Sequence, residues 1–197
     1  MKTLLISAAL AASVLPTVAS AQAVPAAVVA VVDLDRVTSE CNACKTANTA
    51  LRSQLTALQS RQQALATPLE TEQKSIQSAI DALPQGKEPD AALQTRIKSW
   101  QSRRDQAAQE IARGEQQLQR NQAYVNKQVH DKLGPIYQQV MQRRGANIMV
   151  DVGATLATAT SVDVTNDVIA ALNTAMPTLQ TTAPAQATPQ RQQPQGR

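Results

Sequence analysis

The feature that most constrains the fold is a long stretch, residues 36–144, that is almost free of glycine and proline. Its interruptions are Pro68, Gly114, Gly134-Pro135 and the cluster "PQGKEP" at 84–89. Through the first half, apolar residues recur in steps of three and four, or in steps that sum to seven: Leu51, Leu55, Leu58, Leu65, Leu69, Ile76, Ala79 and Leu83. This spacing is the seam of a heptad repeat and predicts a long helix that packs along another helix.

The second half of the stretch carries the partner seam, formed by Leu93, Ile97, Trp100, Ala107, Ile111, Leu118 and Val125. The cluster at 84–89 is the strongest turn signal in the chain. Two long helices joined by a short turn form an antiparallel hairpin. At about 1.5 Å per residue, each helix would be on the order of 60 Å long. We therefore expect residues 39–144 to form an arm that projects from the rest of the protein.

Pro68 lies inside the first predicted helix and allows two interpretations. A proline within a helix removes a hydrogen bond and kinks the helix. Alternatively, Thr67 caps a new helix in which Pro68 is the first residue and Glu70 lies in the first turn. Both interpretations predict a bend or a weak point midway along the arm.

Short apolar segments flank the arm. "AAVVAVV", residues 26–32, is a continuous β-branched run that predicts a strand buried on both faces. After the arm, "NIMVDVG" at 147–153 and "TLATAT" at 155–160 predict two more strands. The two ends of the chain must then meet in one β-containing body, formed by residues 22–38 and 145–176.

The predicted body closes with a short helix in residues 161–176. Asp163 or Thr165 can cap this helix, and Val168, Ile169 and Leu172 form its buried stripe. A body of this size has a marginal hydrophobic core. We therefore expect the protein to be an obligate oligomer, in which association supplies the missing burial.

The two termini have distinct compositions. Residues 1–21 have a short basic start, an apolar stretch and the small residues Ala19-Ser20-Ala21, a pattern typical of a secretory signal peptide. Residues 177–197 are rich in Pro, Gln, Thr and Ala without an apolar period, which predicts a disordered tail. The leader predicts a periplasmic destination, where cysteines are exposed to oxidation.

Both cysteines of the chain lie in Cys41-Asn42-Ala43-Cys44. A redox enzyme of the thioredoxin type needs a βαβ scaffold, which this sequence lacks. Zinc needs four ligands, and the other soft candidate, His130, is far away in sequence. We expect a disulfide at the junction between a short helix and the long one. A bridge between subunits is the alternative.

No other pattern predicts catalysis or a cofactor. Asp33-Leu34-Asp35-Arg36-Val37 matches the D-x-D nucleophile motif of haloacid-dehalogenase phosphatases, but the further parallel strands and ligands of that fold are missing. Capping of a helix by Asp33 or Asp35 is the better interpretation. The sequence therefore predicts no catalytic, metal-binding or cofactor-binding residues and no enzyme.

The motifs at the two ends resemble the Skp/OmpH family of periplasmic chaperones. "AVVAVVDLDRVTSE" is similar to the opening strand and first helical turn of the family. The segment from "KLGPIYQQV" to "VIAALN" is similar to its closing part, including the motif residues Asp163, Val164, Thr165, Val168 and Ile169. The resemblance covers nearly the whole chain apart from the leader and tail.

The resemblance implies a fold that is mainly α with a small β body, with a long antiparallel helical-hairpin arm (coiled coil) projecting from a strand-containing trimerisation domain. It implies a homotrimer that acts as an ATP-independent holdase. Such a chaperone binds unfolded outer-membrane β-barrel proteins in the cavity between its arms. A structural or adaptor coiled-coil protein of the envelope is the alternative function.

The sequence departs from the family in two places. The Cys41–Cys44 pair stands where relatives often have a break with proline or glycine. Between residues 61 and 120 the basic and acidic residues of the arm are nearly balanced, and the formal net charge of the chain is only +4. This mild charge predicts no nucleic-acid partner and at most a weak contact with an anionic membrane surface.

Overall fold

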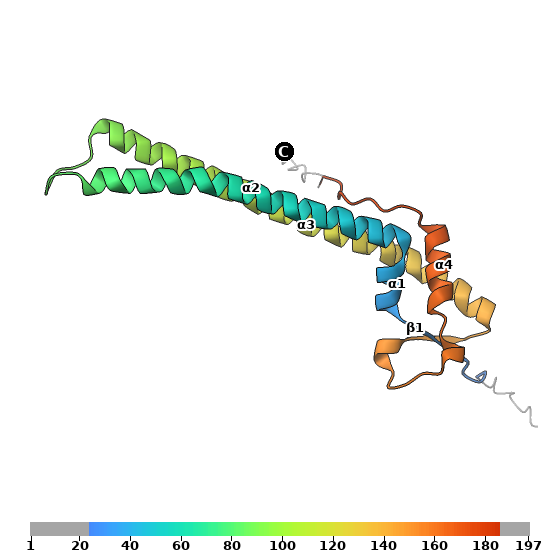
Figure 1. The fold of residues 1–197 in the computed structure, drawn as a ribbon. Coiled ribbons are helices and arrows are strands. Elements are labelled where there is room, and N and C mark those ends of the chain that lie inside the picture. Colours follow the sequence, from blue (N-terminus) through green and yellow to red (C-terminus); the bar gives the residue numbers. More distant parts are fainter. Residues whose placement is uncertain (1–23, 186–197) are drawn as a thin grey trace, which may run out of the picture.

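The computed structural model describes residues 24–185, which form a small body with a long helical rod projecting from it (Figure 1). The predicted signal peptide, residues 1–21, lies outside the described residues. In chain order the elements are β1 (Val29–Val32), α1 (Leu34–Glu40), α2 (Asn42–Asp81), α3 (Ala91–Arg144), β2 (Ile148–Asp151), the 3-10 helices η1 (Val152–Ala154) and η2 (Thr160–Val162), and α4 (Thr165–Ala175). The prediction of a mainly α fold with a small β body is confirmed.

Helices α2 and α3 lie side by side and form the predicted antiparallel hairpin (Figure 1). With 40 residues, α2 is about 60 Å long. With 54 residues, α3 is about 80 Å long and continues past the start of α2 into the body. Its buried residues lie toward its C-terminal end, from Asn121 to Val140. The same helix therefore serves as one side of the arm and as part of the core.

The turn at the tip lies between α2 and α3, as the sequence predicts. Gly86 adopts a φ of 79°, a conformation that glycine reaches without strain. The Lys87 backbone N–H donates to the Pro84 carbonyl at 3.0 Å. Asp90 then caps α3 by accepting a hydrogen bond from the Leu93 N–H at 2.8 Å. Glycine and the aspartate cap together reverse the chain between the two helices.

Pro68 lies inside α2, which continues unbroken from Asn42 to Asp81. The interpretation of a new helix capped by Thr67 is therefore wrong. The Thr67 hydroxyl instead donates to the carbonyl of Gln63, four residues earlier, at 3.0 Å. The indole N–H of Trp100 donates to the Leu69 carbonyl at 3.0 Å, which links α3 to α2 beside the proline. Packing against α3 thus supports the helix where proline weakens it.

At its other end, α3 stops at Gly145, which has a φ of 66°. The Ala146 N–H donates to the Met141 carbonyl at 2.9 Å, a bond typical of a helix that ends in a left-handed residue. Three residues later β2 begins at Ile148. Gly145 therefore ends α3 within the body and turns the chain toward β2. Among residues 24–185, no helix combines the length and apolar character needed to cross a bilayer.

The sheet of the body consists of β1 and β2 in parallel, with Val29 opposite Ile148 and Val32 opposite Asp151. On its other side, β1 forms a single bridge from Val31 to Asp163. The prediction of a strand at 155–160 is wrong. Residues 155–159 are irregular, and η2 begins at Thr160. A strand also needs backbone partners on a neighbouring strand, and the two-stranded sheet of β1 and β2 does not include this segment.

The hydrophobic core lies where α1, α3 and α4 meet over the sheet. Val37, Val140, Val168 and Leu172 are each fully buried, one from α1, one from α3 and two from α4. Ile169 packs against this cluster and is partly buried. The predicted buried stripe of the last helix is therefore confirmed. These side chains bring together residues from both ends of the chain.

The segment after α4 differs from its prediction. Leu179 packs against the core, and residues 180–183 form hydrogen bonds with α2 and α3. The predicted start of a disordered tail at Pro177 is therefore too early. Residues 186–197, the rest of that predicted tail, lie outside the described residues.

Gly114 allows a close approach between the two helices of the arm. A Cβ atom at this position would lie 2.5 Å from Cδ1 of Leu58. We expect Gly114→Ala to displace the end of the half-buried Leu58 side chain, at a cost that cancels most of the gain of about 1 kcal/mol in helix propensity. In the Leu58→Ala background, Gly114→Ala should instead stabilise the protein by about 1 kcal/mol. Urea unfolding followed by circular dichroism, at fixed protein concentration, measures this coupling.

Gly134→Ala is the matched control, because Gly134 lies in the same helix and nothing surrounds its Cβ position within 4 Å. This substitution should stabilise α3 by about 1 kcal/mol in either background. Additive effects of Leu58→Ala and Gly114→Ala would contradict the close approach.

Candidate functional site: the arm surface and its junction with the body

The apolar seam of the arm is only partly covered. Of its predicted residues, Ile76 and Val125 are buried, at 7% and 5% exposure. Leu55 remains 43% exposed. Most of the others are half-buried: Leu51, Leu58, Leu65, Leu69, Ala79, Leu83, Leu93, Ile97, Trp100, Ala107, Ile111 and Leu118. A hairpin of two helices therefore leaves apolar surface in contact with solvent along its length.

Shallow grooves follow the exposed parts of the seam. One, of about 310 Å³, is lined by Leu65, Leu69 and Ile111 among others. A second, also of about 310 Å³, lies beside Leu55 and Leu118. Both are open grooves on the surface of the arm, and their volume is near the lower end of the range for ligand pockets. The arm is therefore suited to many weak contacts along an extended chain.

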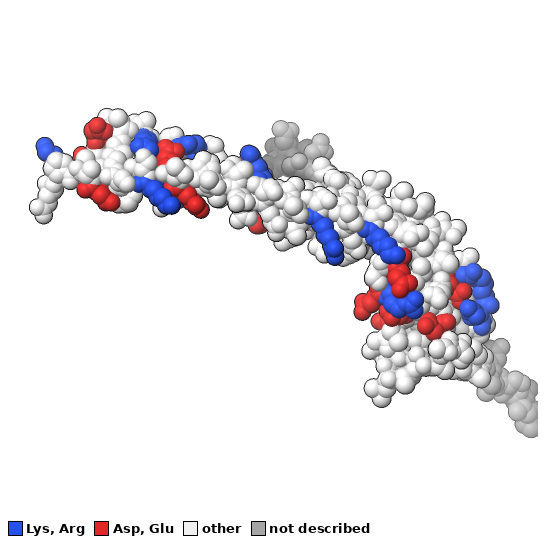
Figure 2. All heavy atoms as spheres, in the orientation of Figure 1, with Lys and Arg blue, Asp and Glu red and all other residues white. Residues whose placement is uncertain are grey.

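Charges of both signs are intermixed along the arm (Figure 2). Arg61 of α2 and Glu110 of α3 form an ion pair at 2.6 Å, and the hydrogen bond from Arg61 lowers the pKa of Glu110. Nearer the tip, Glu72 pairs with Arg103 and, at 3.5 Å, with Arg96. Exposed pairs of this kind add little stability. On the face that Figure 2 shows, side chains of both signs lie close together along the outer part of the arm.

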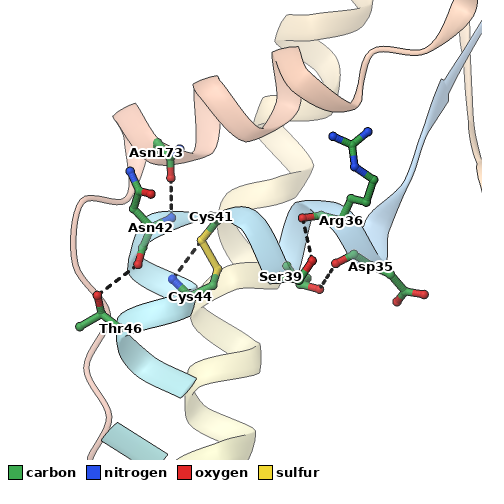
Figure 3. Close-up of a disulfide and its surroundings, with 9 residues drawn as sticks. Asp35, Arg36, Ser39, Cys41, Asn42, Cys44, Thr46 and Asn173 are labelled. Carbon is green, nitrogen blue, oxygen red and sulfur yellow. Dashed lines mark hydrogen bonds between the residues drawn. A yellow bond between two sulfur atoms is a disulfide. The ribbon is translucent and has the colours of Figure 1, made fainter. Parts of the chain in front are cut away.

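The junction between arm and body lies at Cys41, between α1 and α2 (Figure 3). In the structure Cys41 and Cys44 form a disulfide, and both residues are buried in the core. The Cys41 sulfur also accepts a hydrogen bond from the Cys44 N–H at 3.1 Å. Asn173 of α4 accepts from the Asn42 N–H at 2.8 Å, a donor that the helix itself leaves without a partner. This junction links the start of α2 to α4.

Asp33 has the capping role that the sequence predicts. Its carboxylate accepts a hydrogen bond from the Arg36 N–H at 2.8 Å, and its own N–H donates to the Thr165 hydroxyl at 2.9 Å. The Thr165 N–H in turn donates to Asp163 at 2.8 Å. Hydrogen bonds from the side chain and backbone of Thr165, together with the nearby charge of Arg36, lower the pKa of Asp163. These contacts join the starts of α1 and α4.

His130 is exposed on α3 and lines a groove of about 540 Å³ with Thr38, Cys44 and Asn48. Within the described part of the chain, no group of three or more His, Cys, Asp or Glu side chains is placed to bind a metal ion.

The structure also shows a set of polar residues that the sequence analysis missed. Gln54, Asn121 and Gln128, here called the amide row, lie near the base of the arm and bond to residues 180–183. Asn121 is only 4% exposed. Its place in the sequence, three residues after Leu118 and four before Val125, is a seam position. A polar residue at such a position was the signal that could have revealed the site.

Comparison with known proteins agrees with this architecture. The family model described as "Outer membrane protein (OmpH-like)" matches residues 28–172. The crystal structure of a candidate outer membrane chaperone (OmpH-like) from Caulobacter crescentus CB15 superposes with a TM-score of 0.68 at 17% sequence identity. The match covers 84% of this chain and 96% of that one. A search of curated proteins finds no match.

The chain belongs to the OmpH-like family. The family match spans both strands, the whole arm and most of α4, so it includes the body as well as the generic helices. This is a family of chaperones for the outer membrane and not of enzymes. The predicted family and the predicted absence of an enzymatic function are both confirmed. The protein is therefore of the chaperone class, with the arm surface as its candidate binding site.

We predict that Cys41 and Cys44 pair within one subunit of the native protein. On a non-reducing gel the purified protein should then run as a single chain, and reduction should add two hydrogens to its intact mass. Because the bridge closes a very short loop, reduction should lower the free energy of unfolding by at most about 2 kcal/mol. A multimer band that disappears on reduction would favour the bridge between subunits. Free thiols in the oxidised protein would contradict pairing altogether.

Proposed function

We propose that the protein is a periplasmic, ATP-independent holdase that binds unfolded outer-membrane β-barrel proteins between the arms of a homotrimer. The observation that carries this proposal is the incompletely covered apolar seam of the arm. An isolated hairpin that existed only as a spacer would gain stability from a better covered seam. The open grooves instead suit weak, repeated contacts with an unfolded chain.

The surface of the body supports association into an oligomer. Val29 and Ile148, paired across the sheet, are 40% and 43% exposed, and Leu156 is fully exposed. Apolar residues gathered around a two-stranded sheet are typical of an interface that another subunit covers. The family resemblance favours three subunits, with the arms projecting from a common base and enclosing a cavity.

The mechanism is enclosure by many weak contacts. Each groove along the seam holds an apolar side chain only weakly, but several grooves on several arms act on the same chain at once. The client is thereby kept apart from other unfolded chains without a nucleotide cycle. Intermixed charges give the arm little preference for acidic or basic clients. Contact with an anionic membrane surface is accordingly weak and sensitive to salt.

Leu156 tests the oligomer. We expect Leu156→Asp to dissociate the trimer, because it places a charge in the apolar interface. Ala157→Asp, at the neighbouring exposed residue of the same loop, is the control and should remain trimeric. Light scattering gives the mass, and small-angle X-ray scattering gives the shape. A wild-type protein with the mass of one chain would refute the trimer.

Leu55 tests the binding surface. Stoichiometric protein without nucleotide should suppress aggregation of an outer-membrane β-barrel protein diluted from urea. Leu55→Gln removes an exposed apolar seam residue and should weaken client binding about two- to fivefold, whereas Ala57→Gln, on the exposed side of the same helix, should not. Light scattering follows aggregation, and fluorescence titration gives the affinity.

Absence of any suppression of aggregation would contradict the holdase function. Crosslinking to one discrete folded partner would favour the adaptor alternative.

A further inference from the structure

The segment that follows α4 runs back along the arm in an extended conformation (Figure 1). Its side chains alternate in exposure: Leu179, Thr181 and Ala183 are half-buried, whereas Gln180 and Thr182 are exposed. This period of two is that of a β-strand with one face against a surface. The surface is formed by α2 and α3 near the base of the arm.

The amide row forms hydrogen bonds with the backbone of this segment. Gln128 forms two hydrogen bonds with Gln180: its side-chain NH₂ donates to the carbonyl at 2.8 Å, and its side-chain oxygen accepts from the N–H at 3.1 Å. Gln54 donates to the Thr181 carbonyl at 3.2 Å. Asn121 accepts from the Ala183 N–H at 2.8 Å. Side-chain amides carry the same donor and acceptor as a peptide group, so the row pairs with the segment much as a strand would.

The row is a built site whose parts support one another. The Asn121 NH₂ donates to the Gln54 side-chain oxygen at 2.7 Å, and Gln117 donates to the Asn121 oxygen at 2.7 Å. These bonds orient Gln54 and Asn121 whether or not the segment is present. The buried Asn121 oxygen keeps the bond from Gln117 if the Ala183 N–H leaves. The segment can therefore be replaced without stranding the buried amide.

We propose that the amide row is a binding site for the backbone of an extended client chain, and that residues 178–183 occupy it as a displaceable substitute when no client is bound. This inference rests on the proposed function and specifies one contact through which it operates. The backbone is common to all polypeptides, so the site binds a chain whatever its sequence. Strands of outer-membrane β-barrels alternate apolar and polar residues. An alternating chain of that kind repeats the pattern of Leu179, Thr181 and Ala183.

Displacement is the consequence that can be measured. The segment is part of the same chain, so its effective concentration at the site is high and a client must compete with it. The apparent affinity for client then equals the intrinsic affinity of the open site multiplied by the fraction of sites that the segment leaves open. Two of the four hydrogen bonds between the segment and the row, those of Gln128, are exposed, so that water competes with them, and the other two are partly buried. Occupation by the segment is therefore reversible.

Hydrogen exchange on the wild-type full-length protein tests the displacement. The N–H groups of Gln180 and Ala183 should be protected in the free protein. Adding an outer-membrane β-barrel protein diluted from urea should increase their exchange at least about threefold, while the amides of α3 stay protected. Client binding with unchanged protection at these two positions would overturn the inference and leave the holdase function intact. Absence of any client binding would overturn both.

Two double variants of the segment provide the matched test. Gln180→Pro with Ala183→Pro removes the two N–H groups that bond to the amide row and leaves the row itself unchanged. Thr178→Pro with Thr182→Pro adds the same two prolines at residues for which the structure shows no N–H bond within the described part of the chain. We expect the first variant to bind client about threefold or more tightly than wild type, and the second to bind as wild type does.

The result that would overturn the inference is equal client affinity in the two double variants. Loss of affinity in the first variant would also overturn it, because the segment would then aid binding instead of competing. Circular dichroism checks that both variants keep the helical content of the wild type. A third comparison, Gln128→Met against the exposed Gln119→Met of the same helix, should weaken client binding only in the first.

Discussion

The parallel pairing of β1 with β2 is the contact on which the rest of the structure depends. Parallel strands cannot be joined by a tight turn and need a long crossover. Here the crossover includes the entire hairpin of α2 and α3. Two strands of four residues each, one before the hairpin and one after it, therefore fix where the long rod begins and ends. Hydrogen bonds between Thr165 and both Asp33 and Asp163, and between Asn173 and Asn42 at the start of α2, add to this closure. The arm is oriented because both of its ends are held in one small core.

The arm combines stability with an open apolar surface. Two helices cover only part of each other, and the seam residues remain half-exposed between ion pairs such as Arg61–Glu110. Gly114 brings the helices close at Leu58, and Trp100 donates to α2 beside Pro68. These contacts hold the rod together at separate points and leave grooves between them. A fully covered seam would be more stable but would present fewer apolar contacts to an unfolded chain.

Much of this architecture was predictable from local patterns, and the errors have physical causes. The heptad seam and the turn at 84–89 predicted the hairpin, because helical periodicity and turn residues act within a few positions of one another. The strand expected at 155–160 is absent, because a strand also needs a backbone partner, and alternation within one segment does not supply one. The segment after Pro177 lacks an apolar period, yet side chains of α2 and α3 distant in sequence bond to its residues 180–183. Asn121 was overlooked for the same reason, since its partners come from three parts of the chain.

By itself, the sequence determined the helical hairpin, the place of its turn, the capping by Asp33, the buried stripe of α4 and the family to which the chain belongs. Each of these follows from residue types at fixed short spacings or from motifs preserved in order along the chain. Only the tertiary structure decided that α2 runs unbroken through Pro68, that Gly114 lies against Leu58, and that the amide row faces the backbone of residues 180–183. These outcomes depend on which surfaces meet after folding, and local periodicity carries no information about contacts between residues so far apart in the sequence.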